Sequence, residues 1–387
     1  MKKRWKAFYI IMLLIIGMVL GYIGIQLGEY AAMADAAMAD AANASYEMDF
    51  IAELLKMEFV LIGGFLFGYF FQIIVHESGH LIFGRLTGYK YVSYRIFSHI
   101  FINKNGKLTR KRFKIVGTAG QCLMDPPEMV NGTIPYILYN LGGCLMNFIC
   151  SLICLILYFV LRDSAPWLAV GIMLTALIGI FFGLLNLIPI KGSANDGRNI
   201  ISIGKSLEVR HAFWLQLRIN AIMTAGGRYR EIPEEWLMLP GNADLNNHIF
   251  CTTAIFRFNY LYDNHEFEQA KEWAEKLLET VDQMLPIHRM ELKCELLLLE
   301  IIGQCRKDVI DQLYTKELKI YIKKTKIYIS RMVLMYAYTK LVSKDAAEAG
   351  NYYAAFKKAA DTYPFAGEYE AQKEMIEIID NTAAKWC

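Results

Sequence analysis

Two histidines and a glutamate within an apolar stretch have the types and spacing of a zinc-dependent hydrolytic site. His76, Glu77 and His80 form the pattern HExxH. On a helix, side chains four positions apart project from one face, so both imidazoles can bind one Zn²⁺. Glu77 is then placed to accept a proton from a water that the metal activates. The uncharged run before the motif begins at Phe59, and ionisable residues in such apolar spans are costly and usually functional.

A third ligand is needed, because catalytic zinc takes three protein ligands and keeps one position for water. The best candidate is Asp196, which is followed by Gly197. It comes shortly after Asn186-Leu-Ile-Pro189, at the end of a later apolar run. The two motifs must meet in the fold for this candidate to be correct.

Long uncharged runs fill the first half of the chain and predict membrane-spanning helices. Of the 387 residues, 55% are hydrophobic and 20% are charged, whereas soluble domains have about 25% charged residues. A spanning helix needs about 20 apolar residues. We therefore expect four transmembrane helices, near residues 7–27, 59–86, 135–161 and 167–189.

The positions of lysine and arginine predict how these helices are oriented. The tail before residue 7 has four basic residues and no acidic ones, and the connector 89–133 has eight basic residues against two acidic ones. The connector 28–58 has seven acidic residues against one lysine. This pattern predicts a multi-pass cell-membrane protein with both termini in the cytoplasm. The short basic tail is compatible with a bacterial plasma membrane.

The same topology places the two motifs at one depth. The second span runs inward, and His76 lies about 25 Å along it from Phe59. That position is near the cytoplasmic boundary. The fourth span also runs inward and ends at Asn186–Pro189. Two unrelated motifs would have no reason to coincide in this way.

The remaining segments predict a mostly α-helical chain with one small β element. Asn105-Gly106 separates two alternating runs, 91–102 and 108–116, which is typical of a hairpin. From residue 203 the apolar spacing becomes helical. The expected helices lie at 206–224, 245–262, 266–281, 287–303, 318–341, 344–361 and 367–384. We therefore expect a first helix with an outside linker (1–58), a membrane core (59–202) with a cytoplasmic hairpin (89–133), and a cytoplasmic helical domain (203–387).

Part of the C-terminal half resembles a known repeat. Residues 260–278 resemble the turn and second helix of a tetratricopeptide repeat, although the ~34-residue period is not sustained. Such modules bind proteins, so a protein partner is expected at this domain. A generic helical bundle is the alternative.

The motifs together resemble the site-2 protease family of intramembrane zinc metalloproteases, the M50-like peptidases. The resemblance rests on HExGH in one apolar helix and on Asn-x-x-Pro with Asp-Gly after a later one, and it covers residues 59–200. It implies one Zn²⁺ per chain, held by His76, His80 and Asp196, with Glu77 as catalytic base. This chain has six residues between Pro189 and Asp196 where the family usually has four. It also has Cys144 in the family's G-P-x-x-N motif, at the proline position.

The resemblance implies an endopeptidase that cleaves a transmembrane or membrane-proximal segment of a membrane protein, or a peptide precursor. Asn147 and Asn186 are candidates to donate hydrogen bonds to the substrate or the developing oxyanion. Helix–helix packing is the alternative role for both. The lipid bilayer is a further expected partner. The net charge of +3 gives no reason to expect nucleic acid.

Two other functions stay open at this point. One is a catalytically inactive membrane scaffold whose helical domain binds partners, and the longer spacing before Asp196 is its best support. The other is a membrane zinc protease of the CAAX-processing kind, which would need a distant glutamate as third ligand. The identity of the third ligand separates this last possibility from the site-2 type.

Overall fold

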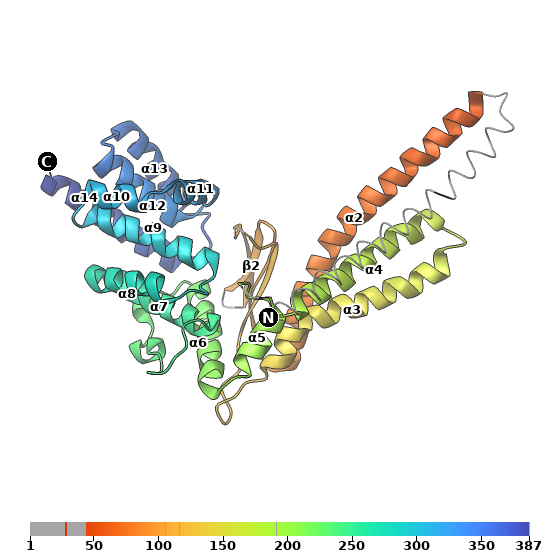
Figure 1. The fold of residues 1–387 in the computed structure, drawn as a ribbon, viewed down its shortest axis with the longest axis horizontal. Coiled ribbons are helices and arrows are strands. Elements are labelled where there is room, and N and C mark those ends of the chain that lie inside the picture. Colours follow the sequence, from red (N-terminus) through yellow and green to blue (C-terminus); the bar gives the residue numbers. More distant parts are fainter. Residues whose placement is uncertain (1–27, 29–43, 105, 116, 191, 387) are drawn as a thin grey trace. The chain divides into compact units, whose positions relative to one another are not determined.

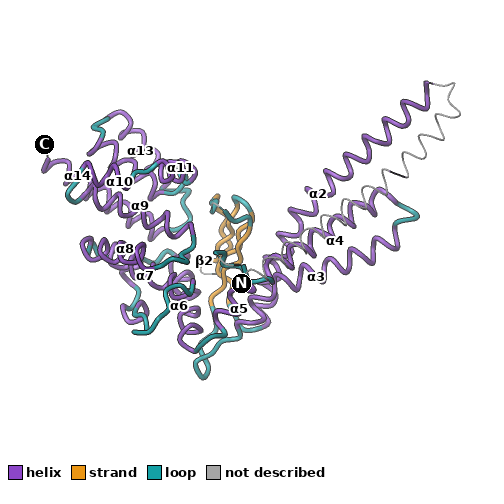
Figure 2. Tube along the Cα trace, viewed as in Figure 1, coloured by secondary structure: helices purple, strands orange, loops and turns teal. Residues whose placement is uncertain are grey.

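The computed structural model describes residues 28, 44–104, 106–115, 117–190 and 192–386, and these are mostly helical with one small sheet (Figures 1 and 2). The expected helix at 7–27 lies outside the described residues. The helices are α2 (Ala44–Leu86), α3 (Tyr136–Leu161), α4 (Pro166–Leu187), α5 (Asp196–Ile203), α6 (Leu207–Ala225), α7 (His248–Asp263), α8 (Phe267–Thr280), α9 (Pro286–Ile302), α10 (Lys307–Leu313), α11 (Lys316–Lys324), α12 (Ile329–Ala337), α13 (Ala346–Ala359) and α14 (Ala366–Trp386). Shorter helical turns are η1 (Tyr229–Glu231), η2 (Glu234–Leu237) and η3 (Tyr338–Val342).

Three helices are long and apolar enough to cross a membrane. They are Leu55–Leu86 within α2, all of α3 and all of α4, which confirms the expected helices at 59–86, 135–161 and 167–189 as candidate spans. The connector expected at 28–58 is partly helical, because α2 begins at Ala44 and continues without a break. With 43 residues, α2 is about 65 Å long, twice the hydrocarbon thickness of a bilayer.

The described chain divides into two compact units. The first contains the chain up to Phe83, then Tyr139–Pro189 and Asn195–Gly197. The second contains Gly84–Leu138, Ile190–Ala194 and Arg198–Cys387, so the sheet groups with the C-terminal helices.

Within the first unit, the outward faces of the helices are apolar. Phe59 on α2 is 79% exposed and Val160 on α3 is 68% exposed, as expected for side chains that face lipid rather than water. The buried side of α4 carries mainly small residues, including Ala169, Ala176 and Gly179. Small residues allow helix backbones to approach closely in a membrane, and α4 packs in this way.

The sheet is larger than the expected hairpin. Strands β1 (Lys90–Ile96), β2 (His99–Lys104), β3 (Lys107–Arg112) and β4 (Gly120–Asp125) form an antiparallel sheet in the order β3-β2-β1-β4. Lys104 pairs with Lys107, so β2 and β3 form a hairpin between the two expected runs. The first expected strand is broken at Phe97, whose φ is +53°. Arg95 secures this break, because its guanidinium donates to the carbonyl oxygens of Phe97 and Gly120.

The helices of the second unit follow the expected pattern except between residues 303 and 342. The single helix expected at 318–341 is wrong, because α11 and α12 are separated by a turn at Thr325–Tyr328. Ile322 and Ile329 both pack in the core, so the apolar spacing continues across the turn. The spacing alone therefore does not indicate that the helix ends there. The short helix α10 was not expected. The tetratricopeptide-like character of this unit stays a prediction.

Candidate metal centre

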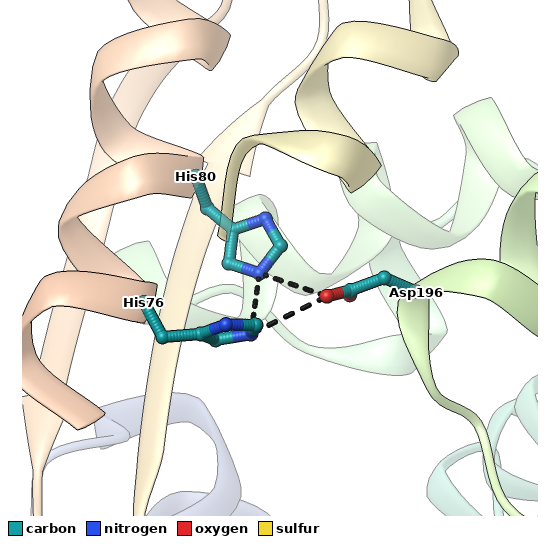
Figure 3. A group of neighbouring side chains, drawn as sticks. All are labelled: His76, His80 and Asp196. Carbon is teal, nitrogen blue, oxygen red and sulfur yellow. Dashed lines mark hydrogen bonds and ion pairs between the residues drawn. The ribbon is translucent and has the colours of Figure 1, made fainter. Parts of the chain in front are cut away.

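Three metal-ligating side chains from two distant parts of the sequence converge in the first unit. His76 and His80 project from the same face of α2, and Asp196 is the first residue of α5 (Figure 3). The two Nε2 atoms are 3.2 Å apart. Oδ2 of Asp196 lies 3.3 Å from Nε2 of His76 and 3.5 Å from Nε2 of His80. The three residues form a group that could hold a metal ion.

These distances fit tetrahedral zinc. With metal–ligand bonds of about 2.0–2.1 Å in a tetrahedral arrangement, neighbouring ligand atoms are about 3.3 Å apart. All three observed separations lie within a few tenths of an ångström of that value. Two imidazoles and one carboxylate leave a fourth position for water, as in catalytic zinc sites.

The opposite nitrogen of each imidazole is held by a hydrogen-bond acceptor. Nδ1 of His76 lies 2.7 Å from Oδ1 of Asn147, and Nδ1 of His80 lies 2.8 Å from the backbone oxygen of Tyr139. Because a carbonyl oxygen only accepts, each Nδ1 must carry the proton. In the neutral ring each Nε2 then has its lone pair free and directed at the common point, which is the tautomer that a metal ligand requires.

A chain of hydrogen bonds fixes the orientation of Asn147 and ends on backbone. The Asn147 amide donates to both the backbone oxygen and Oε1 of Gln72, at 2.9 and 2.8 Å. Gln72 in turn donates to the backbone oxygen of Thr175 on α4, at 3.0 Å. Since backbone oxygens cannot donate, the direction of every bond in this chain is determined. The ring of His76 is thereby tied to three helices.

Hydrogen bonds and close backbone packing at the start of α5 fix the position of Asp196. Asn195 is buried and its amide donates to the backbone oxygens of Leu185 and Ile188, at 2.9 and 2.6 Å. These carbonyls belong to the end of α4, so Asn195 joins the two helices. A Cβ at Gly197 would lie 1.8 Å from the backbone oxygen of Leu187. Only glycine permits this approach, which explains why glycine follows Asp196.

Asp196 itself is well suited to remain ionised. Burial alone would raise the pKa of its carboxyl, but the neighbouring His80 and His76 rings, when protonated, hold that pKa below its ordinary value. The thiol of Cys144 also donates to Oδ2, with a sulfur–oxygen distance of 3.7 Å. A carboxylate held ionised is a competent ligand for a divalent cation.

The other expected site residues have different surroundings. Glu77 is half-buried on α2, next to His76 in the chain. Asn186 donates back to the carbonyl of Phe182 in its own helix, at 3.1 Å. Both amide hydrogens of Asn147 are directed at Gln72. A role for Asn147 as donor to a substrate stays a prediction and would require one of these bonds to break, whereas its present contacts make it a positioning residue for His76.

Three contributors were not singled out from the sequence: Gln72, Asn195 and the backbone oxygen of Tyr139. Gln72 could have been identified from the sequence, because it is a polar residue in an apolar span and lies four positions before His76, on the same helix face. Asn195 is adjacent to Asp196 and has the residue type that commonly precedes a helix. A backbone carbonyl has no sequence signal at all.

Comparison with known families points in the same direction. Residues 64–169 match the family model described as Peptidase family M50. The resemblance to the site-2 protease family is confirmed. The M50 segment includes the HExxH motif and Asn147, and it ends before Asp196. No curated protein and no solved structure matches the chain.

The contact at Gly197 gives a first prediction. Gly197→Ala should displace Asp196 and weaken zinc binding by about tenfold or more, because the backbone of Leu187 cannot yield easily. Gly171→Ala is the matched control, since nothing lies within 4 Å of a Cβ built there. Zinc affinity is measured by competition with a chelator on both purified variants. Equal affinities would contradict the importance of this contact.

The hydrogen-bond chain gives a second prediction. Asn147→Leu removes the acceptor of the His76 Nδ1 proton and should lower zinc affinity by roughly 10- to 100-fold, the usual effect of losing such a partner. Asn147→Asp keeps an acceptor oxygen and should retain more affinity than Asn147→Leu. Measuring both variants beside the parent separates loss of the acceptor from loss of packing. An Asn147→Leu protein with parental affinity would show that the chain does not matter.

Proposed function

We propose that the protein is an intramembrane zinc metalloendopeptidase. The observation that carries the proposal is the convergence of two Nε2 lone pairs and one carboxylate oxygen at zinc-like separations. This group begins on a helix long and apolar enough to cross a membrane. The match of residues 64–169 to Peptidase family M50 supports a membrane metalloprotease.

In this proposal His76, His80 and Asp196 hold one Zn²⁺ per chain. The metal would polarise the scissile carbonyl and lower the pKa of a water beside it. Glu77 is the general base, which accepts the proton of the attacking water and delivers it to the leaving amine. Asn147 keeps His76 in the required tautomer throughout. Cys144 and Tyr139 keep Asp196 and His80 in place.

The substrate class follows from the location of the site. A peptide bond near the cytoplasmic boundary of a membrane belongs to a transmembrane or membrane-proximal segment. In a helix, such a segment has its carbonyls hydrogen-bonded internally, so it must unwind locally before cleavage. A membrane-tethered protein or a peptide precursor is the proposed substrate, and Asn147 and Asn186 are the candidates to contact it.

The C-terminal helices have a separate proposed role. Basic residues in the tail and in the connector 89–133 favour cytoplasmic termini in a cell membrane, here a bacterial plasma membrane. The helical domain from residue 203 would then lie in the cytoplasm, where a tetratricopeptide-like surface could recruit a protein partner.

The proposal predicts that zinc binding and cleavage can be separated. The purified parent should contain about one zinc per chain by elemental analysis, and His80→Ala and Asp196→Ala should lose it. Glu77→Gln keeps the ligands and should keep the zinc, while cleavage falls roughly 10²- to 10⁴-fold. Cleavage of fluorescent casein is followed by fluorescence. Cleavage of a set of single-span transmembrane peptides in detergent is followed by mass spectrometry.

Each result has a defined meaning. Zinc retained in Asp196→Ala would indicate another third ligand, such as the distant glutamate of a CAAX-type protease. A folded, zinc-supplemented parent without zinc would overturn the proposal and favour the inactive scaffold. Equal cleavage by the parent and Glu77→Gln would remove Glu77 as the base.

A further inference from the structure

A second site lies in the unit that contains the sheet and the C-terminal helices. A partly open cavity of about 430 Å³ is lined by residues that include members of the sheet, of α6 and α7, and of α9 and α14. Cavities that bind small molecules have volumes of roughly 300–1,000 Å³. None of its lining residues belongs to the metal centre, and the proposed protease chemistry gives it no role.

The charges around this cavity do not balance. Four carboxyl groups line it, on Asp263, Glu291, Glu295 and Glu368, against the single basic side chain of Arg228. Arg228 is already used, because it pairs with Asp263 at 2.5 Å and also with Glu374.

One further arginine, Arg331, forms ion pairs with two of the three remaining carboxyl groups. Arg331 lies 2.5 Å from Oε2 of Glu291 and 3.5 Å from Oε1 of Glu295. Within the described part of the chain, Glu368 has no ion pair. Three carboxyl groups therefore share one cation, and the cavity has an excess of negative charge when they are ionised.

Aromatic rings form another wall. Phe113, which follows β3, contacts Tyr363 and Phe365 edge-on at centroid distances of 5.7 and 5.0 Å. It also stacks on Tyr328 at 6.1 Å. All four rings line the cavity. The negative faces of such rings attract a cation within about 6 Å, and the rings also cover an apolar stem.

Two buried polar atoms at the cavity lack a well-formed hydrogen bond. The hydroxyl of Tyr262 faces Gln372 and Glu295, but among the residues the structure describes neither this hydroxyl nor Oε1 of Gln372 has a partner of normal hydrogen-bond geometry. Tyr262 is 8% exposed and Gln372 is 6% exposed, and both line the cavity. A buried oxygen without a hydrogen-bond partner is destabilising. A ligand with N–H donors would satisfy both atoms.

We propose that this cavity binds a small organic cation, a primary amine or a guanidinium carried on a short apolar or aromatic stem. The cationic head would lie among Glu291, Glu295 and Glu368 and donate to the Gln372 carbonyl. The stem would pack on the rings around Phe113. A bare metal ion fits less well, because among the described residues His76, His80 and Asp196 form the group with metal-ligand spacing. The proposal goes beyond the protease activity and does not depend on it.

The test is direct binding to the full-length protein in detergent. Calorimetry with phenethylamine and agmatine should show saturable binding of at least one, with a Kd below about 1 mM. The neutral 2-phenylethanol and the anionic 3-phenylpropionate have similar stems and should bind at least tenfold more weakly. No saturation by either cation, or equal binding of the neutral compound, would overturn the proposal.

Matched variants locate the binding. Glu368→Gln and Glu295→Gln keep the shape of the side chain and should each weaken cation binding at least tenfold. Glu370→Gln is the control, because Glu370 is on the same helix but is exposed, does not line the cavity and pairs with Lys373. Circular dichroism and thermal unfolding of the variants show whether each has folded. Undiminished binding in a folded Glu295→Gln/Glu368→Gln double variant would place the cation elsewhere.

The proposal also predicts a pH dependence. Burial raises the pKa of Glu295 and of Glu368 to about 7. A cation prefers the ionised carboxylate, so its affinity should rise roughly tenfold for each carboxyl between pH 6 and pH 8. The double variant should lose this dependence. The other charged or titratable groups around the two carboxyls are Glu291, Arg331, Tyr262, Tyr363, Asp263 and Arg228. Affinity that is constant or falls over this range would contradict the role of the two carboxyls.

Discussion

The need to satisfy buried polar atoms in an apolar surrounding determines the structure around the metal centre. An amide left without partners there costs about 2–7 kcal/mol, and Gln72 and Asn147 are both fully buried. Their hydrogen bonds run from the carbonyl of Thr175 to Nδ1 of His76 without an unpaired member. The same bonds that make these amides tolerable also fix the tautomer of the histidine. Stability of the bundle and readiness for metal binding therefore have one cause.

The close approach of backbones is the second requirement, and it explains why small residues accompany the ligands. A Cβ at Gly143 would lie 2.5–2.7 Å from the ring atoms of His76, so a larger residue would push the imidazole away from its position. Gly197 has the same relation to the end of α4. Side chains provide the chemistry of the site, but glycines decide how precisely the ligands can meet. This links the spacing of the motifs to the packing of the helices.

Local sequence patterns predicted the pair of histidines on one helix face and the candidate spans, because both depend on short-range periodicity. HExxH places two imidazoles on one helix face, and long apolar runs mark α2, α3 and α4. The features that the sequence did not predict arise from contacts between distant segments. The carbonyl of Tyr139 has no side-chain signal, and the break between α11 and α12 is hidden because both helices bury the same kind of residue. The additional strand β4 likewise depends on pairing with β1 across a long connection.

The two sites place buried carboxyl groups in opposite situations. Asp196 lies beside two imidazoles that favour its ionised form, and a dication at the point between them would complete the charge balance. Glu295 and Glu368 lie in a cavity where cations are too few, so burial shifts their pKa upward toward neutrality. A protein can accept such a shift when the protonated acids are useful as hydrogen-bond donors, or when a ligand supplies the missing charge. The aromatic wall favours the second explanation, since a neutral acid does not need it.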